Sequence, residues 1–166
     1  GVKFDELVVL ESAQGFMKSS ALRNLCPNEA WFSDDFPLNV DSKQLIERTA
    51  GKFIIESPDL AGLRRSQTDH LKSTLSRSVD GPVRLAWGRF PIEVPRQFIV
   101  IGTTNSQAYL SDATGNRRFW PIRVGQFDVE GLKNARDQIW AEAAFREAAG
   151  ESIRLNPKLY ALAALQ

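Results

Sequence analysis

The fold is decided by the stretch Val8-Val9-Leu10-Glu11-Ser12-Ala13-Gln14-Gly15-Phe16-Met17-Lys18-Ser19-Ser20. An apolar run, a turn that contains glycine and then Lys-Ser before a helix-like stretch form the order that a phosphate-binding loop needs. The strand aims the turn, and the N-terminus of the helix meets the anion. The usual pattern is Gly-x-x-x-x-Gly-Lys-Ser/Thr, so Lys18 and Ser19 fit it, whereas Ser12 and Met17 stand where it has glycines. The stretch therefore predicts a phosphate loop that lacks both terminal glycines.

The overall composition is that of a globular domain without a strong charge. The chain has 166 residues, of which 43% are hydrophobic, and this length suits one compact domain. Its 21 basic and 20 acidic side chains give a net charge of +1, so no global field draws it to nucleic acid or to an anionic membrane. Binding to DNA would need a local basic patch, and most of the arginines lie between Arg64 and Arg123.

Cysteine usage and hydropathy favour a cytoplasmic protein without membrane association. The single Cys26 excludes an internal disulfide and a Cys-rich zinc site, and we expect it to be a buried thiol. No stretch approaches the roughly 18 apolar residues of a membrane span, and no basic region followed by an apolar core stands at the N-terminus. Only a few residues precede the first apolar run, so we expect residues 1–166 to be one domain of a longer chain.

Apolar runs that alternate with helical patterns indicate the fold class. Strong strands are expected at 7–10, 52–56, 98–102 and within 117–123, and a short one at 31–32. Helices are expected at 18–25, 42–50, 66–76 and 129–149, the last with Leu132, Ile139, Trp140 and Ala144 as its apolar face. A turn is expected at 80–82 and a hairpin or strand at 84–94. This alternation predicts an α/β three-layer αβα sandwich around a parallel sheet.

Polar residues at strand ends supply candidates for triphosphate hydrolysis, because ligands of open α/β sheets sit at the carboxyl edge. Lys18 would neutralise the phosphates, and Ser19 would bind Mg²⁺ through its hydroxyl. Glu56 and Asp59 would complete the water shell of the metal or polarise the attacking water, and Asn105 would orient that water or contact the γ-phosphate. The predicted nucleotide-binding residues are Gln14, Gly15, Phe16, Met17, Lys18, Ser19 and Ser20.

Each of these residue types also has a structural explanation. Carboxylates and arginines are usually solvated surface groups, and asparagine after a strand is commonly a turn former. Aromatic side chains are more often core than stacking platforms for bases, and we expect core positions for Trp31, Trp87, Phe90, Phe119 and Trp120. The order of the polar residues along the chain is therefore more informative than any one of them.

That order resembles the virulence-associated protein E family over nearly the whole chain. The resemblance rests on residues 11–19, Phe53-Ile54-Ile55-Glu56, Gly102-Thr103-Thr104-Asn105, Gly115-Asn116-Arg117-Arg118-Phe119-Trp120-Pro121 and residues 137–143. It implies a P-loop ATPase domain of phages and mobile elements, similar to superfamily-three helicases, AAA+-like domains and poxvirus-type primase-helicases. Such relatives use ATP and Mg²⁺, form rings that are usually hexamers, and move on DNA with a primase fused or as a partner.

The resemblance also assigns roles to single residues. Lys18 and Ser19 become the Walker A pair, Glu56 the Walker B acid and metal ligand, and Asp59 a second acid. Asn105 becomes the sensor residue. Arg118, with Arg117 beside it, becomes the arginine finger, which can act on a neighbouring subunit. Basic residues near the nucleotide or the DNA in relatives fall at Lys72, Arg84, Arg89 and Arg96.

Two other functions remain open at the level of sequence. The substituted glycines at Ser12 and Met17 are compatible with a degenerate P-loop domain that binds DNA or a replication partner without hydrolysis. A small-molecule P-loop kinase is the third class. The lack of an acceptor-binding lid in the sequence and the paired arginines late in the chain argue against it.

Overall fold

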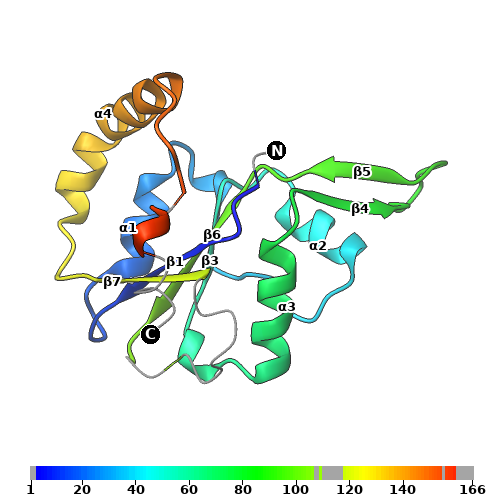
Figure 1. Ribbon diagram of the computed structural model, residues 1–166, viewed down its shortest axis with the longest axis horizontal. Helices are drawn as coiled ribbons and strands as arrows, with labels where there is room; N and C mark the ends of the chain where they lie inside the picture. Colours follow the sequence, from blue (N-terminus) through cyan, green and yellow to red (C-terminus); the bar gives the residue numbers. More distant parts are fainter. Residues whose placement is uncertain (1–2, 107–108, 110–117, 155, 160–166) are drawn as a thin grey trace.

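A parallel sheet with the strand order β2-β3-β6-β1-β7 forms the centre of the computed structural model, which describes residues 3–106, 109, 118–154 and 156–159 (Figure 1). The strands of this sheet are β1 Leu7–Glu11, β2 Phe32–Ser33, β3 Ile54–Ser57, β6 Ile99–Thr104 and β7 Phe119–Arg123. Every neighbouring pair is parallel, so the carboxyl ends of the strands share one edge. The chain is a three-layer α/β sandwich, which confirms the predicted fold class.

Helices cover both faces of the sheet (Figure 1). They are α1 Lys18–Leu25, α2 Ser42–Thr49, α3 Arg65–Leu75 and α4 Val129–Ala148, with short 3-10 turns at Glu29–Trp31, Leu60–Gly62 and Pro157–Leu159. The side chain of Asp41 caps α2 by accepting a hydrogen bond from the Gln44 amide. None of these helices, within the described part of the chain, is long and apolar enough to cross a membrane.

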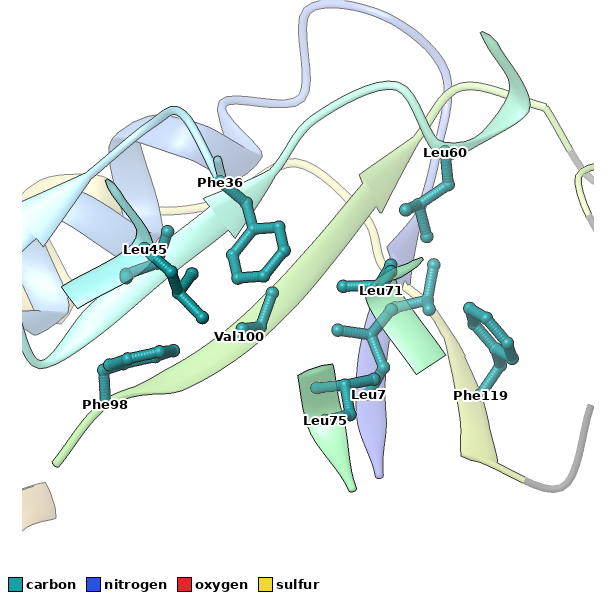
Figure 2. Packing of buried hydrophobic residues seen from close by; sticks show 11 residues of the cluster. Leu7, Phe36, Leu45, Leu60, Leu71, Leu75, Phe98, Val100 and Phe119 are labelled. Atoms are coloured by element: carbon teal, nitrogen blue, oxygen red, sulfur yellow. The ribbon is translucent and has the colours of Figure 1, made fainter. Parts of the chain in front are cut away.

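Successive residues of β1 belong to two separate cores because side chains alternate across a strand. Leu7 and Val9 pack on the face that α2 and α3 cover, where Leu71 is fully buried (Figure 2). Leu10 packs on the opposite face, against Leu22 of α1. The continuous apolar runs of the sequence therefore reflect strands that are covered on both sides.

The same alternation sets the direction of Glu56 on β3. Ile55 belongs to the core under α2 and α3, whereas Ile54 belongs to the core under α1. Glu56 lies two residues after Ile54, so its side chain points to the α1 side of the sheet. This parity brings the carboxylate toward the start of α1.

A two-stranded antiparallel hairpin of β4 Val79–Val83 and β5 Ile92–Pro95 projects from the sheet as an arm (Figure 1). The prediction of a turn at 80–82 was wrong, because these residues lie inside β4 and the chain reverses later, between the two strands. The pairing shifts register between Asp80 and Val83. Gly81 has φ +109°, and a Cβ there would lie 2.7 Å from the carbonyl oxygen of Ile92, so an irregularity in β4 replaces the expected turn.

The tip of the arm exposes two aromatic side chains that were expected in the core. Trp87 is fully exposed and Phe90 is 76% exposed. Trp31 is also exposed, at 44%, whereas Phe119 is buried as predicted and Trp120 is partly buried. The prediction was wrong for Trp87, Phe90 and Trp31, because the arm and the turn before β2 carry them beyond the two cores.

Helix α4 packs against α1 with few apolar side chains. The indole of Trp140 donates a hydrogen bond of 2.8 Å to the Leu25 carbonyl and lies 5.1 Å from the ring of Phe53. Ile139 is 42% exposed and Ala144 is exposed. The predicted apolar face of this helix is therefore correct at Trp140 and wrong at Ile139 and Ala144.

Arg96 fixes the base of the arm. Its guanidinium donates hydrogen bonds of 2.5 Å and 3.1 Å to the two carboxylate oxygens of Asp80, and a further one to the carbonyl of Thr74 in α3. It also lies 5.1 Å from the ring centre of Phe98. Both charged side chains of this pair are buried, with exposures of 8% and 4%. Arg96 is thus engaged in the fold, which argues against the predicted contact with nucleotide or DNA.

We expect Arg96→Met to destabilise the domain by about 3 kcal/mol or more, because it leaves the buried Asp80 carboxylate without its counter-charge. The double variant Arg96→Met/Asp80→Leu should recover most of that loss, since two apolar side chains leave no charge behind. Urea unfolding followed by circular dichroism measures both. Arg146→Met is the matched control on an exposed pair and should leave the stability nearly unchanged. A single Arg96→Met variant as stable as the control would show that the pair contributes nothing.

Candidate nucleotide site

The loop between β1 and α1 lies at the carboxyl edge of the sheet. Glu11 at the end of β1 pairs in register with Thr104 at the end of β6, and the amide of Ser12 donates to the Thr104 carbonyl at 3.4 Å. Strand β3 adjoins β6 on its other side. The ends of β1, β6 and β3 therefore meet at the start of α1, where ligands of open α/β sheets bind.

The backbone of this loop has the shape that glycines normally provide. Gly15 has φ +90°, and Met17 has φ 60° and ψ 30°, which is left-handed. The side chain of Met17 is 46% exposed. Met17 thus adopts a left-handed backbone that glycine would adopt without strain, at a conformational cost of about 1–2 kcal/mol.

Lys18 is the charged residue of the loop, and it is buried, with 8% of its surface exposed. Its ammonium donates to the Ser12 hydroxyl at 2.8 Å and to the side-chain oxygen of Asn105 at 2.9 Å. The carbonyls of Ser12 and Ala13 lie at 3.3 Å and 3.4 Å. Burial lowers the pKa of Lys18, while the nearby charge of Glu56 acts to raise it. The predicted Walker lysine and sensor asparagine are therefore in direct contact.

Glu56 is buried at the centre of the site, with 1% exposure. Its Oε1 accepts hydrogen bonds from the hydroxyls of Ser19 at 2.7 Å and Thr103 at 2.6 Å. Its Oε2 is also buried and has no hydrogen-bond partner among the described residues. A buried carboxylate oxygen that lacks a donor is costly, so this oxygen is suited to a cation or to a water on a cation.

Thr103 is a contact of Glu56 to which the sequence assigned no role. Ile101 lies in the core under α1 with Ile54, so Thr103 and Glu56, each two residues further along, face the same side. This alternation of side chains along the strands was the signal in the sequence that could have identified Thr103. Hydroxyl groups from α1 and β6 thus both donate to one oxygen of the carboxylate.

An open cavity of about 390 Å³ connects these groups. Every loop residue from 14 to 20 lines it, together with Glu56, Asp59, Thr103 and Asn105. Its size falls within the range of small-molecule sites. Asp59 has an exposed side chain on a left-handed backbone with φ 46°, so it reaches the cavity from the loop after β3. The structure therefore brings the loop residues, Glu56, Asp59 and Asn105 together.

The basic residues predicted from the resemblance lie elsewhere. Arg118 directly precedes β7, whose first residue pairs with the first residue of β1, so it stands at the amino edge of the sheet, opposite the loop. Lys72 lies 5.8 Å above the Phe119 ring near the same end of β7. Arg84 and Arg89 are exposed on the arm. Arg117 lies outside the described residues.

A phosphate-type loop between β1 and α1, with a carboxylate on β3 and an asparagine after β6, defines a P-loop-like α/β domain. The chain belongs to the virulence-associated protein E-like domain family, whose sequence pattern matches residues 1–166. Among curated proteins, none matches the chain.

Solved structures of the NrS-1 C-terminal region share the fold. The A form apo structure has 12% sequence identity and a TM-score of 0.55, and the match covers 81% of this chain and 35% of that one. A second apo structure has 14% identity and a TM-score of 0.54, with coverage of 82% and 36%. This chain therefore spans little more than a third of the length of these relatives.

We expect Met17→Gly to stabilise the domain by up to about 1 kcal/mol, because glycine adopts a left-handed conformation without the steric cost that methionine meets. Met17→Ala is the matched control, since it removes the exposed side chain but keeps a Cβ and hence the strain. Thermal unfolding of both variants measures the difference. Equal melting temperatures for the glycine and alanine variants would show that the backbone at this position carries no strain.

Proposed function

We propose that this domain binds and hydrolyses Mg²⁺-ATP and uses the cycle to drive a helicase-like motor on DNA. The observation that carries the proposal is the buried Glu56 carboxylate, held by Ser19 on one oxygen and without a donor on the other among the described residues. In P-loop enzymes the serine after the lysine and an acidic residue on a strand together hold Mg²⁺. The family membership and the order of strands support the same assignment.

The chemistry of the donor set suits Mg²⁺. This hard cation prefers oxygen ligands and keeps several of its waters, so a hydroxyl and a carboxylate that binds through water are sufficient protein ligands. Ser19 and Glu56 are the residues that would hold it. When bound there, the metal would supply positive charge against the charge that develops on the phosphates.

The loop supplies the phosphate contacts. Because α1 begins at Lys18, the unpaired N–H groups of its first turn lie at the loop. They and the buried Lys18 ammonium would bind the β- and γ-phosphates. Gly15 leaves open space beside its backbone, since a Cβ added there would meet nothing within 4 Å, and this space allows close approach of a phosphate.

The remaining polar residues are suited to position the attacking water. Glu56 and Asp59 line the cavity with Asn105, and a carboxylate or amide in that place can orient a water for in-line attack. Arg118 lies at the opposite edge of the sheet, so in the proposed mechanism it acts on the site of a neighbouring copy. The proposal therefore includes a ring, with the hexamer and the primase partner of related proteins as its expected context.

The arm is the proposed DNA contact. It carries exposed Arg84 and Arg89 beside the exposed aromatic side chains Trp87 and Phe90. Arginines that contact phosphates, combined with aromatic rings on which bases stack, are the usual means of binding single-stranded nucleic acid without sequence preference. In this proposal the arm is the local basic patch that binding to DNA would need.

A non-hydrolysing module is the alternative that a specific observation favours. Met17 imposes strain on the loop, and Ser12 adds a side chain where the usual pattern has none. A degenerate loop of this kind would keep the fold and the arm, and would bind DNA or a replication partner without turnover.

We expect Glu56→Gln to retain ATP binding but to lower turnover by about 10²-fold or more, because the amide keeps a hydrogen-bond acceptor but loses the negative charge. Lys18→Ala should raise the ATP Kd by about tenfold or more, since it removes a charged donor to phosphate. Calorimetric titration with Mg²⁺-ATP and a phosphate-release assay on the oligomeric protein with single-stranded DNA measure the two effects.

The same assays separate the two functions. Saturable ATP binding with no turnover in the wild type, and no difference from Glu56→Gln, would identify the non-hydrolysing module. Turnover unchanged in Lys18→Ala would reject the assignment of the loop. Ser66→Ala on the exposed face of α3 is the control that should match the wild type.

We expect Arg84→Ala and Arg89→Ala each to reduce the slope of log K against log salt for single-stranded DNA by about 0.7, as the loss of one phosphate contact requires. Trp87→Ala should weaken binding by about 1–3 kcal/mol with little change in slope, because stacking is not ionic. Fluorescence anisotropy over a salt series measures both. The control is Lys133→Ala on α4, which lies on the other side of the molecule from the arm (Figure 1). Arm variants that match this control would exclude the arm as the DNA contact.

A further inference from the structure

The hydrogen-bonding capacity of the Lys18 ammonium is fully used inside the protein. A lysine has three protons to donate and no acceptor. Four oxygens lie within 3.4 Å of the Lys18 nitrogen, and the two nearest are side-chain oxygens of Ser12 and Asn105. A phosphate that binds Lys18 must therefore replace bonds that already exist.

The Ser12 hydroxyl is oriented as an acceptor for this lysine. Its own proton is donated to the carbonyl of Ala13 at 3.0 Å, so a lone pair is left for the Lys18 ammonium at 2.8 Å. The glycine of the usual loop pattern has no side chain and could not make this bond. The contact is thus a property of this sequence rather than of the loop shape.

Asn105 completes the arrangement from the other side. Because lysine only donates, the atom of Asn105 that faces it must be the amide oxygen. While this bond is present, the Asn105 side chain is directed at Lys18 instead of at a water or phosphate in the cavity. Ser12 and Asn105 together surround the ammonium with neutral oxygens.

We propose that Ser12 is a latch that holds Lys18 by taking the place of a phosphate oxygen, and that it competes with the nucleotide for Lys18. The inference rests on the proposed function for the identity of the competing ligand. A phosphate oxygen is charged and forms the stronger bond with an ammonium, so binding opens the latch. The affinity for nucleotide is lowered by the hydrogen bond that must first be broken, as for any site whose competent state is only partly populated.

The latch predicts that Ser12→Ala binds both Mg²⁺-ATP and Mg²⁺-triphosphate about tenfold more tightly than the wild type, as expected from the loss of one competing bond to a charged group. Ser12→Ala retains a Cβ, so it does not add the backbone freedom of glycine. Isothermal titration of the full domain measures both ligands. Circular dichroism confirms that each variant is folded, and Ser66→Ala on α3 serves as the distant serine control.

A second measurement tests the latch without any nucleotide. The acetylation rate of Lys18 by acetic anhydride at fixed pH, followed by mass spectrometry of the peptide, should be several-fold faster in Ser12→Ala than in the wild type. Ser12→Thr retains the hydroxyl and should keep the slow rate. Equal rates in all three proteins would overturn the latch even if Ser12→Ala were poorly stable, because Ser12→Thr and the wild type set the reference.

The outcomes separate this inference from the proposed function. Measurable but equal ATP affinity in the wild type and Ser12→Ala overturns the competition and leaves the nucleotide site in place. Weaker binding in Ser12→Ala overturns it too and makes the hydroxyl a phosphate ligand. If no variant binds nucleotide while Lys18 is acetylated faster in Ser12→Ala, the proposed function fails. The conclusion that the Ser12 hydroxyl restrains Lys18 then stands.

Discussion

The hydrogen bonds from Ser19 and Thr103 to Glu56 are the interaction on which the site depends. A carboxylate at 1% exposure is tolerated only if other groups solvate it. Here the donors come from the first turn of α1 and from the end of β6. One buried acid on β3 therefore ties together the three elements whose ends form the cavity. Its second oxygen has no donor among the described residues, and this is the atom that the proposed metal would satisfy.

The fold could be predicted because its signals are local and agree with one another. The apolar runs at β1, β3 and β6 are continuous since helices cover both faces of the sheet. The order of a loop lysine, a strand-borne acid and an asparagine after a later strand also placed Lys18, Glu56 and Asn105 at one edge. Parallel pairing converts that order along the chain into proximity in space.

The failures concern properties that only the tertiary structure decides. Asp80-Gly81-Pro82 is a strong turn signal, yet the pairing of β4 with β5 accommodates it as an irregularity. Trp87 and Phe90 have the composition of core residues, but the arm that carries them leaves both exposed. Arg96 was expected near the nucleotide or the DNA, and its burial against Asp80 was not visible in the sequence. At Met17 the sequence showed a departure from the loop pattern, whereas the backbone shows that the loop shape survives it.

Strand β6 connects the base of the arm to the cavity. Arg96 fixes the base of the arm shortly before this strand, and Asn105 follows its last residue in the cavity. Between them, residues 100–104 are buried, and the strand pairs on both sides, with β3 and β1 as neighbours. A strand held in this way moves as a unit, because close-packed interiors do not deform continuously. The proposed DNA contact and the residue bonded to Lys18 are thus attached to opposite ends of one close-packed strand.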